Sequence, residues 1–289
     1  ETLNFYDLDD PAMPLWMSFT ASGTATVVRG GSIGSITMLN GLLVVGRNGG
    51  GSDTSSTSEA DFLAESFVIR NGTARYQMIW GGVIDRNNSS NGWGATDTSK
   101  KIADSTVNDV AATILEGSEL GALGLPIPTV AVATGSGTDG GISVIHANGS
   151  VYDISQDGTC DSTRSVSFDG DKIVSHWNTV SSTNRHQYIH AIPFADEGAD
   201  DSPLVDFGDL STAGDLNYGH TGSVNTSSAT AKDSCAYGTA AGLTLFKNNY
   251  GNPAEGAVAY ITSAYNTGYM VGDIRGAWLA NTDTEDRCV

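Results

Sequence analysis

Short apolar runs separated by tight-turn dipeptides recur along the whole sequence. Asn40-Gly41 lies between two apolar runs, and the same dipeptide recurs at Asn71-Gly72 and Asn148-Gly149. Asn-Gly favours a two-residue hairpin turn, because both central residues of that turn need a positive φ angle. No window of about 12 residues has apolar side chains at helical spacing. The sequence therefore predicts an all-β chain with antiparallel connections.

Four stretches of the sequence are alike: a strand of small residues leads into a second, more apolar strand. They begin near residues 32, 106, 163 and 227. This spacing suits four-stranded blades with loop insertions. We predict a single β-propeller domain over residues 1–289, with five blades, four of them near 32–80, 106–155, 163–193 and 227–250.

The remaining apolar runs lie near the two ends of the sequence. Residues 1–30 and 257–280 are expected to supply strands to one closing blade, because closure removes the exposed edges of an open ring. An irregular β-sandwich is the alternative that the same pattern allows. The sequence starts at Glu1 without the apolar core of a signal peptide, so we expect a mature product or an excised part of a longer protein.

The charge balance excludes several classes of partner. The chain has 14 Lys and Arg against 33 Asp and Glu, a net charge of −19, although only 16% of its residues are charged. Such a field repels nucleic acids and anionic membrane surfaces. No apolar run approaches the roughly 20 residues of a membrane-spanning helix. We expect an extracellular or virion-surface protein.

Metal and cofactor signals are weak. The three cysteines, Cys160, Cys235 and Cys288, form no CxxC motif, so no metal site is expected, and we interpret them as unpaired. One disulfide, with the third thiol pairing between chains, remains the alternative. The acidic segment 196–209 could bind Ca²⁺, although no EF-hand pattern is present. No other cofactor is indicated.

Motifs associated with catalysis lack their usual structural context. Ser32 lies in a GxSxG sequence and residues 135–140 match GxGxxG, but an apolar strand pattern follows each where the motif requires a helix. His186 and His190 would lie about 13 Å apart on one strand, too far to share a metal ion. We therefore assign no catalytic residue.

Carboxylates are numerous enough to suggest a glycosidase as the alternative function. Five-bladed propellers include glycosidases with Asp and Glu at the central funnel, and Asp7, Asp9, Asp10 and Asp109 are the candidates. Such an enzyme needs a carboxylate pair about 5 to 9.5 Å apart.

Aromatic residues give the stronger binding signal. Candidate ligand-binding residues are those in polar loops or at strand ends, where a ring could stack on a sugar. They are Trp93, Trp177, Tyr265 and Tyr269. Packing between blades or chains is the alternative role. Trp16, Trp80 and Trp278 lie in apolar runs and are expected in the core.

Several segments resemble the propeller-like part of long tail-fibre or appendage proteins of marine phages. The residues that carry this resemblance are 10–17 (DPAMPLWM), 39–46 (LNGLLVVG), 107–111 (VNDVA), 125–134 (LPIPTVAVAT) and 272–279 (GDIRGAWL). The resemblance covers most of the chain, but its motifs are structural. In such proteins the last segment usually leads on to a lectin-like sandwich.

The resemblance implies a structural protein of the phage virion, in a tail fibre or appendage. The domain would attach to the host or act as a spacer, with other appendage subunits as partners and a homo-oligomer within the fibre. A host cell-surface glycan is the expected ligand where attachment occurs. The alternatives are a secreted five-bladed-propeller glycosidase and a secreted lectin-like glycan-binding protein.

Overall fold

The computed structural model describes residues 2–20, 32–49, 56–78, 93–136, 140–154, 162–178, 185–192 and 205–209, and six further strands between 228 and 288. These residues contain no α-helix; a single 3-10 turn, η2, spans Thr98–Lys100. Extended strands form the rest of the regular structure. The all-β prediction is confirmed.

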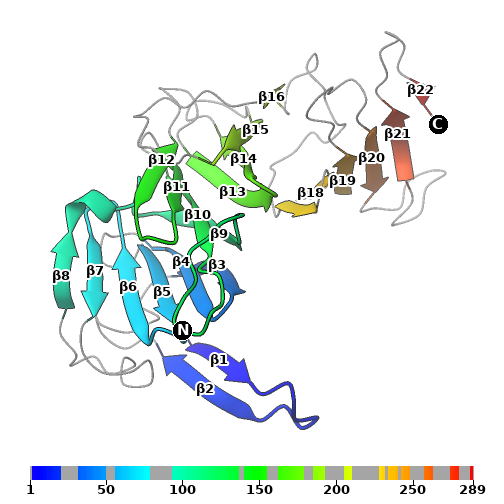
Figure 1. Ribbon diagram of the computed structural model, residues 1–289. Helices are drawn as coiled ribbons and strands as arrows, with labels where there is room; N and C mark the ends of the chain where they lie inside the picture. The colour runs from blue at the N-terminus through cyan, green and yellow to red at the C-terminus, as the bar shows by residue number, and fades with distance from the viewer. Residues whose placement is uncertain are drawn as a thin grey trace.

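The N-terminal half contains a hairpin and two larger antiparallel sheets (Figure 1). The hairpin pairs β1 (Thr2–Tyr6) with β2 (Leu15–Thr20). The first sheet has the order β3 (Ser32–Leu39), β4 (Leu42–Asn48), β5 (Ser56–Asp61), β6 (Ser66–Arg70), β7 (Arg75–Met78) and β8 (Trp93–Asp97). The second sheet contains β9 (Val107–Thr113), β10 (Thr129–Thr134), β11 (Gly141–Ile145) and β12 (Val151–Ile154).

The C-terminal half contains two more antiparallel sheets. The third consists of β13 (Ser162–Asp169), β14 (Lys172–Asn178), β15 (Arg185–Ala191) and β16 (Val205–Asp209). The fourth has six strands: β17 (Ser228–Ala231), β18 (Ser234–Thr239), β19 (Gly242–Lys247), β20 (Ala257–Thr262), β21 (Ile274–Leu279) and β22 (Arg287–Cys288). In every sheet the strands are paired in chain order.

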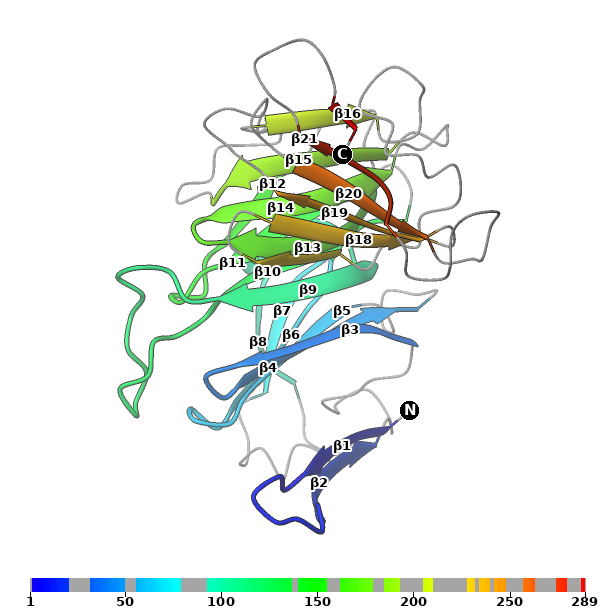
Figure 2. The same cartoon turned by 90° about the vertical axis from the view of Figure 1, so that its right-hand side faces the viewer.

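The first strands of the four large sheets lie next to one another. Strand β9 contacts β3 on one side and β13 on the other, and β13 also contacts β17. The sheets therefore follow one another in chain order, each growing outward from this inner row (Figures 1 and 2). The inner strands begin at residues 32, 107, 162 and 228, beside the blade starts expected from the sequence.

The expected closing blade is not formed by the described strands. Strand β20 pairs with β19, and β21 pairs with β20, so both extend the fourth sheet instead of joining the N-terminal strands. Strands that follow one another through short connections tend to pair with each other. None of the described sheets closes on itself, and the β1–β2 hairpin forms a separate small sheet.

Three apolar clusters fill the spaces between these layers. Phe19 of the hairpin packs with Leu43, Val45, Phe67 and Ile69 on one face of the first sheet. The opposite face of that sheet meets the second sheet through a cluster of valines and isoleucines. A third cluster joins the second sheet to the third. The two clusters that join the second sheet to its neighbours consist mainly of branched aliphatic side chains, which pack well on pleated strands, whereas the cluster beneath the hairpin is rich in phenylalanine.

A carboxylate links the inner strands of three sheets. Asp109 on β9 accepts hydrogen bonds from the Ser35 hydroxyl (2.6 Å) on β3 and from the Val166 backbone N–H (3.0 Å) on β13. It also accepts one from its neighbour, the Val110 N–H (2.9 Å). Burial raises the pKa of Asp109, and these hydrogen bonds oppose that shift. The adjacent Asn108 donates to carbonyls of the second and third sheets.

A buried ion pair joins β5 and β6 of the first sheet, and its arginine also contacts the segment that leads to the second sheet. The Arg70 guanidinium, almost fully buried, donates to the Glu59 carboxylate at 2.7 Å and to the Lys100 carbonyl at 2.9 Å. Next to it, burial and the charge of Arg70 lower the pKa of Arg75. The Ile102 N–H donates to the Asn71 carbonyl at 3.2 Å. This segment is thus held by both charged and backbone contacts.

Candidate binding site

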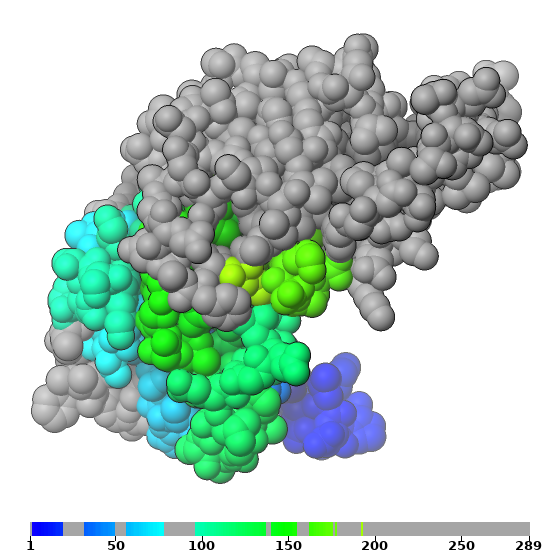
Figure 3. All heavy atoms as spheres, turned by 45° about the horizontal axis from the view of Figure 1, so that its top comes forward, coloured from blue at the N-terminus to red at the C-terminus, as the bar shows by residue number. Residues whose placement is uncertain are grey.

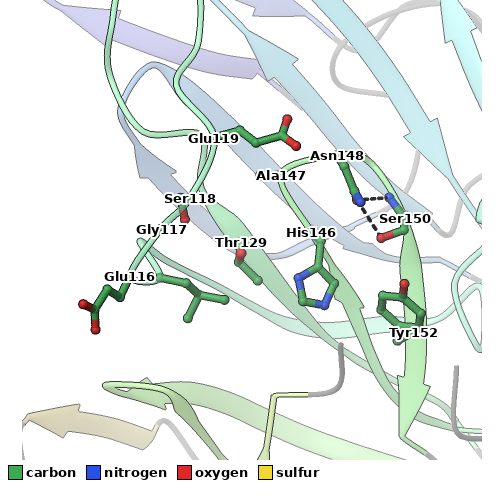
Figure 4. A pocket seen from close by; sticks show the side chains of 11 residues that line it. Glu116, Gly117, Ser118, Glu119, Thr129, His146, Ala147, Asn148, Ser150 and Tyr152 are labelled. Atoms are coloured by element: carbon green, nitrogen blue, oxygen red, sulfur yellow. Dashed lines mark hydrogen bonds between the residues drawn. The ribbon is translucent and has the colours of Figure 1, made fainter. Parts of the chain in front are cut away.

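A shallow groove lies at one end of the second sheet (Figure 4). Its volume is about 190 Å³, and it opens to solvent between the start of the β9–β10 connection and the turn that joins β11 to β12. The lining comes from residues 115–119 on one side and from Thr129, 146–148, Ser150 and Tyr152 on the other. The groove is therefore assembled by two loops and the strand ends between them.

The first wall is a tight turn. The Ser118 N–H donates to the Leu115 carbonyl at 3.1 Å, and Gly117 has a φ of 78° at the third position of the turn. A side chain there would be strained, so glycine suits the position. Glu116 in the turn and Glu119 just after it are both exposed and line the groove; the Glu119 carboxylate points toward the β11–β12 turn, whereas the Glu116 carboxylate points away from it (Figure 4).

The second wall is the β11–β12 turn. The His146 N–H donates to the Ser150 carbonyl at 3.0 Å, and the Gly149 N–H donates to the His146 carbonyl at 2.8 Å. The Asn148 carboxamide oxygen accepts from the Ser150 N–H (2.9 Å) and hydroxyl (2.6 Å). Side-chain capping of this kind fixes a turn without help from a neighbouring element. The wall is therefore held by its own hydrogen bonds.

Two rings lie side by side within the second wall. The imidazole of His146 and the ring of Tyr152 are 5.1 Å apart between centroids, with an angle of 73° between their planes. This edge-to-face arrangement is a favourable one for aromatic pairs. Both side chains are half-buried, so the pair is held in place but still borders the groove.

The groove combines carboxylates, hydroxyls, an amide and aromatic rings, and neither Lys nor Arg lines it. Carboxylate oxygens accept hydrogen bonds from the hydroxyl groups of a ligand, an amide NH₂ group donates to its oxygens, and ring edges and faces contact its C–H groups. Anionic ligands would be repelled by Glu116 and Glu119. Among the described residues, no group of three or more His, Cys, Asp or Glu side chains is arranged to hold a metal ion.

The structure places the four aromatic candidates in different ways. Trp93 is the first residue of β8 and is paired with Met78, but its side chain is outside the described part. Tyr265 and Tyr269 lie outside the described residues altogether. The prediction for Trp177 is wrong: its side chain is 0% exposed, packs in the core between the second and third sheets, and donates to the Ser175 hydroxyl at 2.6 Å. No ring face remains for a ligand.

Three of the four carboxylates considered for catalysis accept hydrogen bonds from the protein itself. Both oxygens of Asp109 are engaged in the hydrogen bonds between inner strands. Asp7 and Asp10 lie in the β1–β2 loop, where each accepts a backbone N–H from two residues later.

The sequence analysis missed the groove. None of His146, Glu116, Glu119 and Tyr152 was among the candidate residues. The Gly117 and Asn148-Gly149 turns are visible in the sequence, but their meeting depends on how β9, β10, β11 and β12 are paired. A search for two polar turns at the same end of adjacent predicted strands could have found it.

Comparisons with known proteins provide no family. No protein-family model matches the chain, and no curated protein matches it either. Solved structures that are similar include a computationally designed protein, at 13% identity, a TM-score of 0.36 and coverage of 89% of this chain and 74% of that one. Another is a humanized mutant of Polycomb Repressive Complex 2 from Chaetomium thermophilum, at 14% identity, a TM-score of 0.43 and coverage of 95% and 55%.

A third similar structure is the hydrazine synthase of Kuenenia stuttgartiensis, at 14% identity, a TM-score of 0.37 and coverage of 84% of this chain and 64% of that one. Likenesses this weak carry no argument about function. Within the described residues, no helix is long and apolar enough to cross a membrane.

Proposed function

We propose that this chain is a binding domain of a phage tail fibre or other virion appendage, exposed on the virion surface, and that it attaches to host glycans through the groove on the second sheet. The sheets would belong to a β-propeller. In the fibre, the domain would work as a homo-oligomer beside other appendage subunits.

The observation that carries the binding role is the groove itself. Two turns, each fixed by its own hydrogen bonds, hold carboxylates, an amide and an aromatic pair around about 190 Å³ of open space. A small polar ring of a ligand fits such a volume. Because the two turns are already held by their own hydrogen bonds, binding costs little conformational entropy, which favours affinity.

Charge limits the class of glycan. Glu116 and Glu119 border the groove, neither Lys nor Arg lines it, and the whole chain carries a net charge of −19. Sugars with carboxylate or sulfate groups would be repelled at long range and at contact. Neutral sugars and amino sugars, whose ammonium group a carboxylate can bind, are the expected ligands.

The phage assignment rests on the resemblance of segments such as 107–111 and 125–134 to appendage proteins. In this chain those segments supply the inner strand β9 and the strand β10, which support the groove. A repeated fibre would present several grooves, and linked sites raise avidity by about 10²–10⁴ over a single site. Weak individual sites are therefore compatible with attachment.

The test presents the chain as a tetramer on streptavidin to arrays of neutral, amino and acidic glycans. We expect binding to neutral or amino sugars, reduced about tenfold by Glu119→Gln through the loss of a charged hydrogen-bond acceptor. Glu65→Gln is the matched control, because Glu65 is an exposed carboxylate on the β5–β6 turn of another sheet.

The other outcomes separate the alternatives. Binding that both variants leave unchanged would remove the groove from the site. Release of shortened sugars from the bound glycans would favour the glycosidase. A tetramer that binds no glycan and no host cell would identify the domain as a passive spacer.

A further inference from the structure

Asn148 differs from the other two asparagines that precede a glycine in the described part of the chain. Asn71 is 4% exposed, and Asn40 is half-buried, with its Nδ2 donating to the Pro126 carbonyl at 2.9 Å. Asn148 is exposed in the β11–β12 turn, and no described residue accepts from its Nδ2. In Figure 3 residues of the second sheet, in green, are open to view. The same dipeptide therefore occurs in three different environments.

An asparagine followed by a glycine brings two reactive groups together. The backbone nitrogen of the glycine can attack the side-chain Cγ of the asparagine and close a cyclic imide, a succinimide. A side chain on the second residue hinders this approach, and glycine has none. The oxygen Oδ1 gains negative charge as the nitrogen adds, so hydrogen-bond donors on Oδ1 favour the step. The reactivity of such a site therefore depends on these donors and on access to Cγ.

The β11–β12 turn supplies two donors to Oδ1 of Asn148. They are the Ser150 N–H at 2.9 Å and the Ser150 hydroxyl at 2.6 Å (Figure 4). Two donors on one carbonyl oxygen are also the arrangement of an oxyanion hole. The Gly149 N–H donates to the His146 carbonyl at 2.8 Å, and this bond has to open before the nitrogen attacks. Because the bond lies in a turn at the surface, opening it costs little free energy.

Asn71 has similar donors but lacks this access. Its carboxamide oxygen accepts from the Thr73 and Ala74 N–H groups, both at 2.9 Å. The N–H of the following Gly72 donates to the Ser105 hydroxyl at 3.0 Å, in the segment that leads to the second sheet. Attack at Asn71 requires this contact around a buried side chain to be broken, which costs more free energy than the opening of a surface turn.

We propose that Asn148 is a modification site, at which the chain deamidates through a succinimide formed with Gly149. The Gly149 nitrogen gives its proton to a base in the solvent and forms a bond to Cγ. The bond between Cγ and Nδ2 breaks, and Nδ2 takes up a proton from the solvent and leaves as ammonia. Water then adds to one of the two imide carbonyls and opens the ring, so position 148 becomes aspartate or isoaspartate. No group is oxidised or reduced.

The product changes the chemistry of the groove. An amide NH₂ group, which donates, is replaced by a carboxylate, which only accepts. The carboxylates of Glu116 and Glu119 already line the groove, and that of Glu119 points toward this turn (Figure 4). A neutral sugar then loses a donor, whereas the ammonium group of an amino sugar gains a charged partner. This consequence rests on the proposed function, but the modification itself requires no ligand.

The experiment incubates the full, folded chain at mildly alkaline pH in water enriched in heavy oxygen and follows the three sites by peptide mass spectrometry. We expect heavy oxygen and isoaspartate to appear at position 148 about tenfold faster than at position 71, because the buried contact must open first. In urea the three sites should react at similar rates, since their environments are lost. Equal rates in the folded chain overturn the proposal, as does a position 148 that reacts only in urea or yields no isoaspartate.

Ser150→Ala tests the donors on Oδ1. It removes the hydroxyl and should slow the reaction at position 148 about fivefold, whereas Ser150→Thr keeps the hydroxyl and the rate. Ser99→Ala is the matched control. The Ser99 N–H (3.0 Å) and hydroxyl (2.6 Å) donate in the same pattern to Asp97, on the first sheet. If Ser150→Ala reacts as fast as the wild-type chain, the turn does not promote the reaction and the proposal fails.

Glycan binding is measured separately, on the arrays of neutral and amino sugars. We expect Asn148→Asp to shift binding from neutral toward amino sugars, and an unchanged preference would contradict the consequence for the groove. The mass measurement involves no glycan. A chain that deamidates at position 148 but binds no sugar therefore refutes the proposed function alone, and a chain that binds sugar but keeps the amide refutes this inference alone.

Discussion

The first sheet is joined to its two neighbours in different ways. Toward the second sheet, directional polar contacts add to the apolar packing: Ser35 donates to Asp109, and Arg70 donates to the Lys100 carbonyl. Toward the hairpin, it packs through an apolar and aromatic cluster in which the Phe5, Phe19 and Phe62 rings lie 5.6 to 6.4 Å apart. Apolar contact is non-directional, whereas a buried hydrogen bond allows few geometries. The position of the inner strands relative to one another is therefore more tightly restrained than the position of the hairpin on the first sheet.

The largest expected effect comes from breaking the buried ion pair between β5 and β6, because its Arg70 also donates to the Lys100 carbonyl of the polar attachment. Glu59→Ala leaves the Arg70 guanidinium, 2% exposed, without its carboxylate, and we expect a loss of about 3–5 kcal/mol in the free energy of unfolding. Urea denaturation measures it, with the exposed Glu65→Ala as control. Adding Arg70→Met should recover much of the loss. If the double variant is no more stable than Glu59→Ala, the unpaired charge is not the cause.

The next effect tests the apolar attachment. Phe19→Ala removes the most buried side chain of the hairpin and should cost about 3 kcal/mol of local stability. Because apolar contacts alone are lost, we expect faster hydrogen exchange in β1 and β2, while β9 and β10 keep their protection. An equal loss of protection in all four strands would show that the hairpin is as firmly coupled as the sheets.

A smaller effect is expected at the contact between inner strands. Ser35→Ala removes one of the hydrogen bonds to the buried Asp109 carboxylate and should cost about 1–3 kcal/mol. Ser99→Ala is a matched control, because Ser99 donates to Asp97 at the same distance of 2.6 Å on the exposed surface. Thermal unfolding compares the two. Similar losses in both variants would mean that burial adds nothing to this contact.

The smallest effect concerns pH. Burial raises the folded-state pKa of Asp109 above its ordinary value of about 3.9, so folding favours the protonated carboxyl. The associated stabilisation is complete below the ordinary value and is lost as the pH rises through the raised pKa. Relative to Asp109→Asn, the wild-type chain should therefore gain stability as the pH falls toward 4. A stability difference that is independent of pH would contradict this assignment.

Two tryptophans show where sequence reasoning succeeds and fails. Trp16 was expected in the core because its neighbours are apolar, and Trp177 was expected at a binding surface because it ends a polar strand. The structure reverses both: Trp16 is 63% exposed and Trp177 is buried. A register shift in β1–β2 between Phe5 and Tyr6 changes the side-chain alternation near Trp16, and the third sheet lies against the second at Trp177. Neither fact is contained in the local sequence.

The Asn-Gly turns show the same limit at the level of the backbone. All three were expected to adopt one turn type, but positive φ at both residues occurs only at Asn40 and Gly41 among them. At Asn71 the side chain instead accepts from the Thr73 and Ala74 N–H groups. The dipeptide predicted the chain reversals and the order of strands, because these are local. Strand β20 pairs with its neighbours in the chain, β19 and β21. The residues at the two ends of the chain do not contain this information, so the sequence placed 257–280 in a closing blade that the described strands do not form.

The outward growth of each sheet has a consequence for how such a chain can diversify. Because the inner strand comes first and later strands add toward the periphery, strands can be gained or lost at the rim without disturbing the inner row. The six-stranded first sheet and the four-stranded second sheet make the same kind of inner contact, β3 with β9 and β9 with β13. The number of outer strands and the side chains on them can thus vary between descendants of such a chain, while the contacts between the inner strands stay the same.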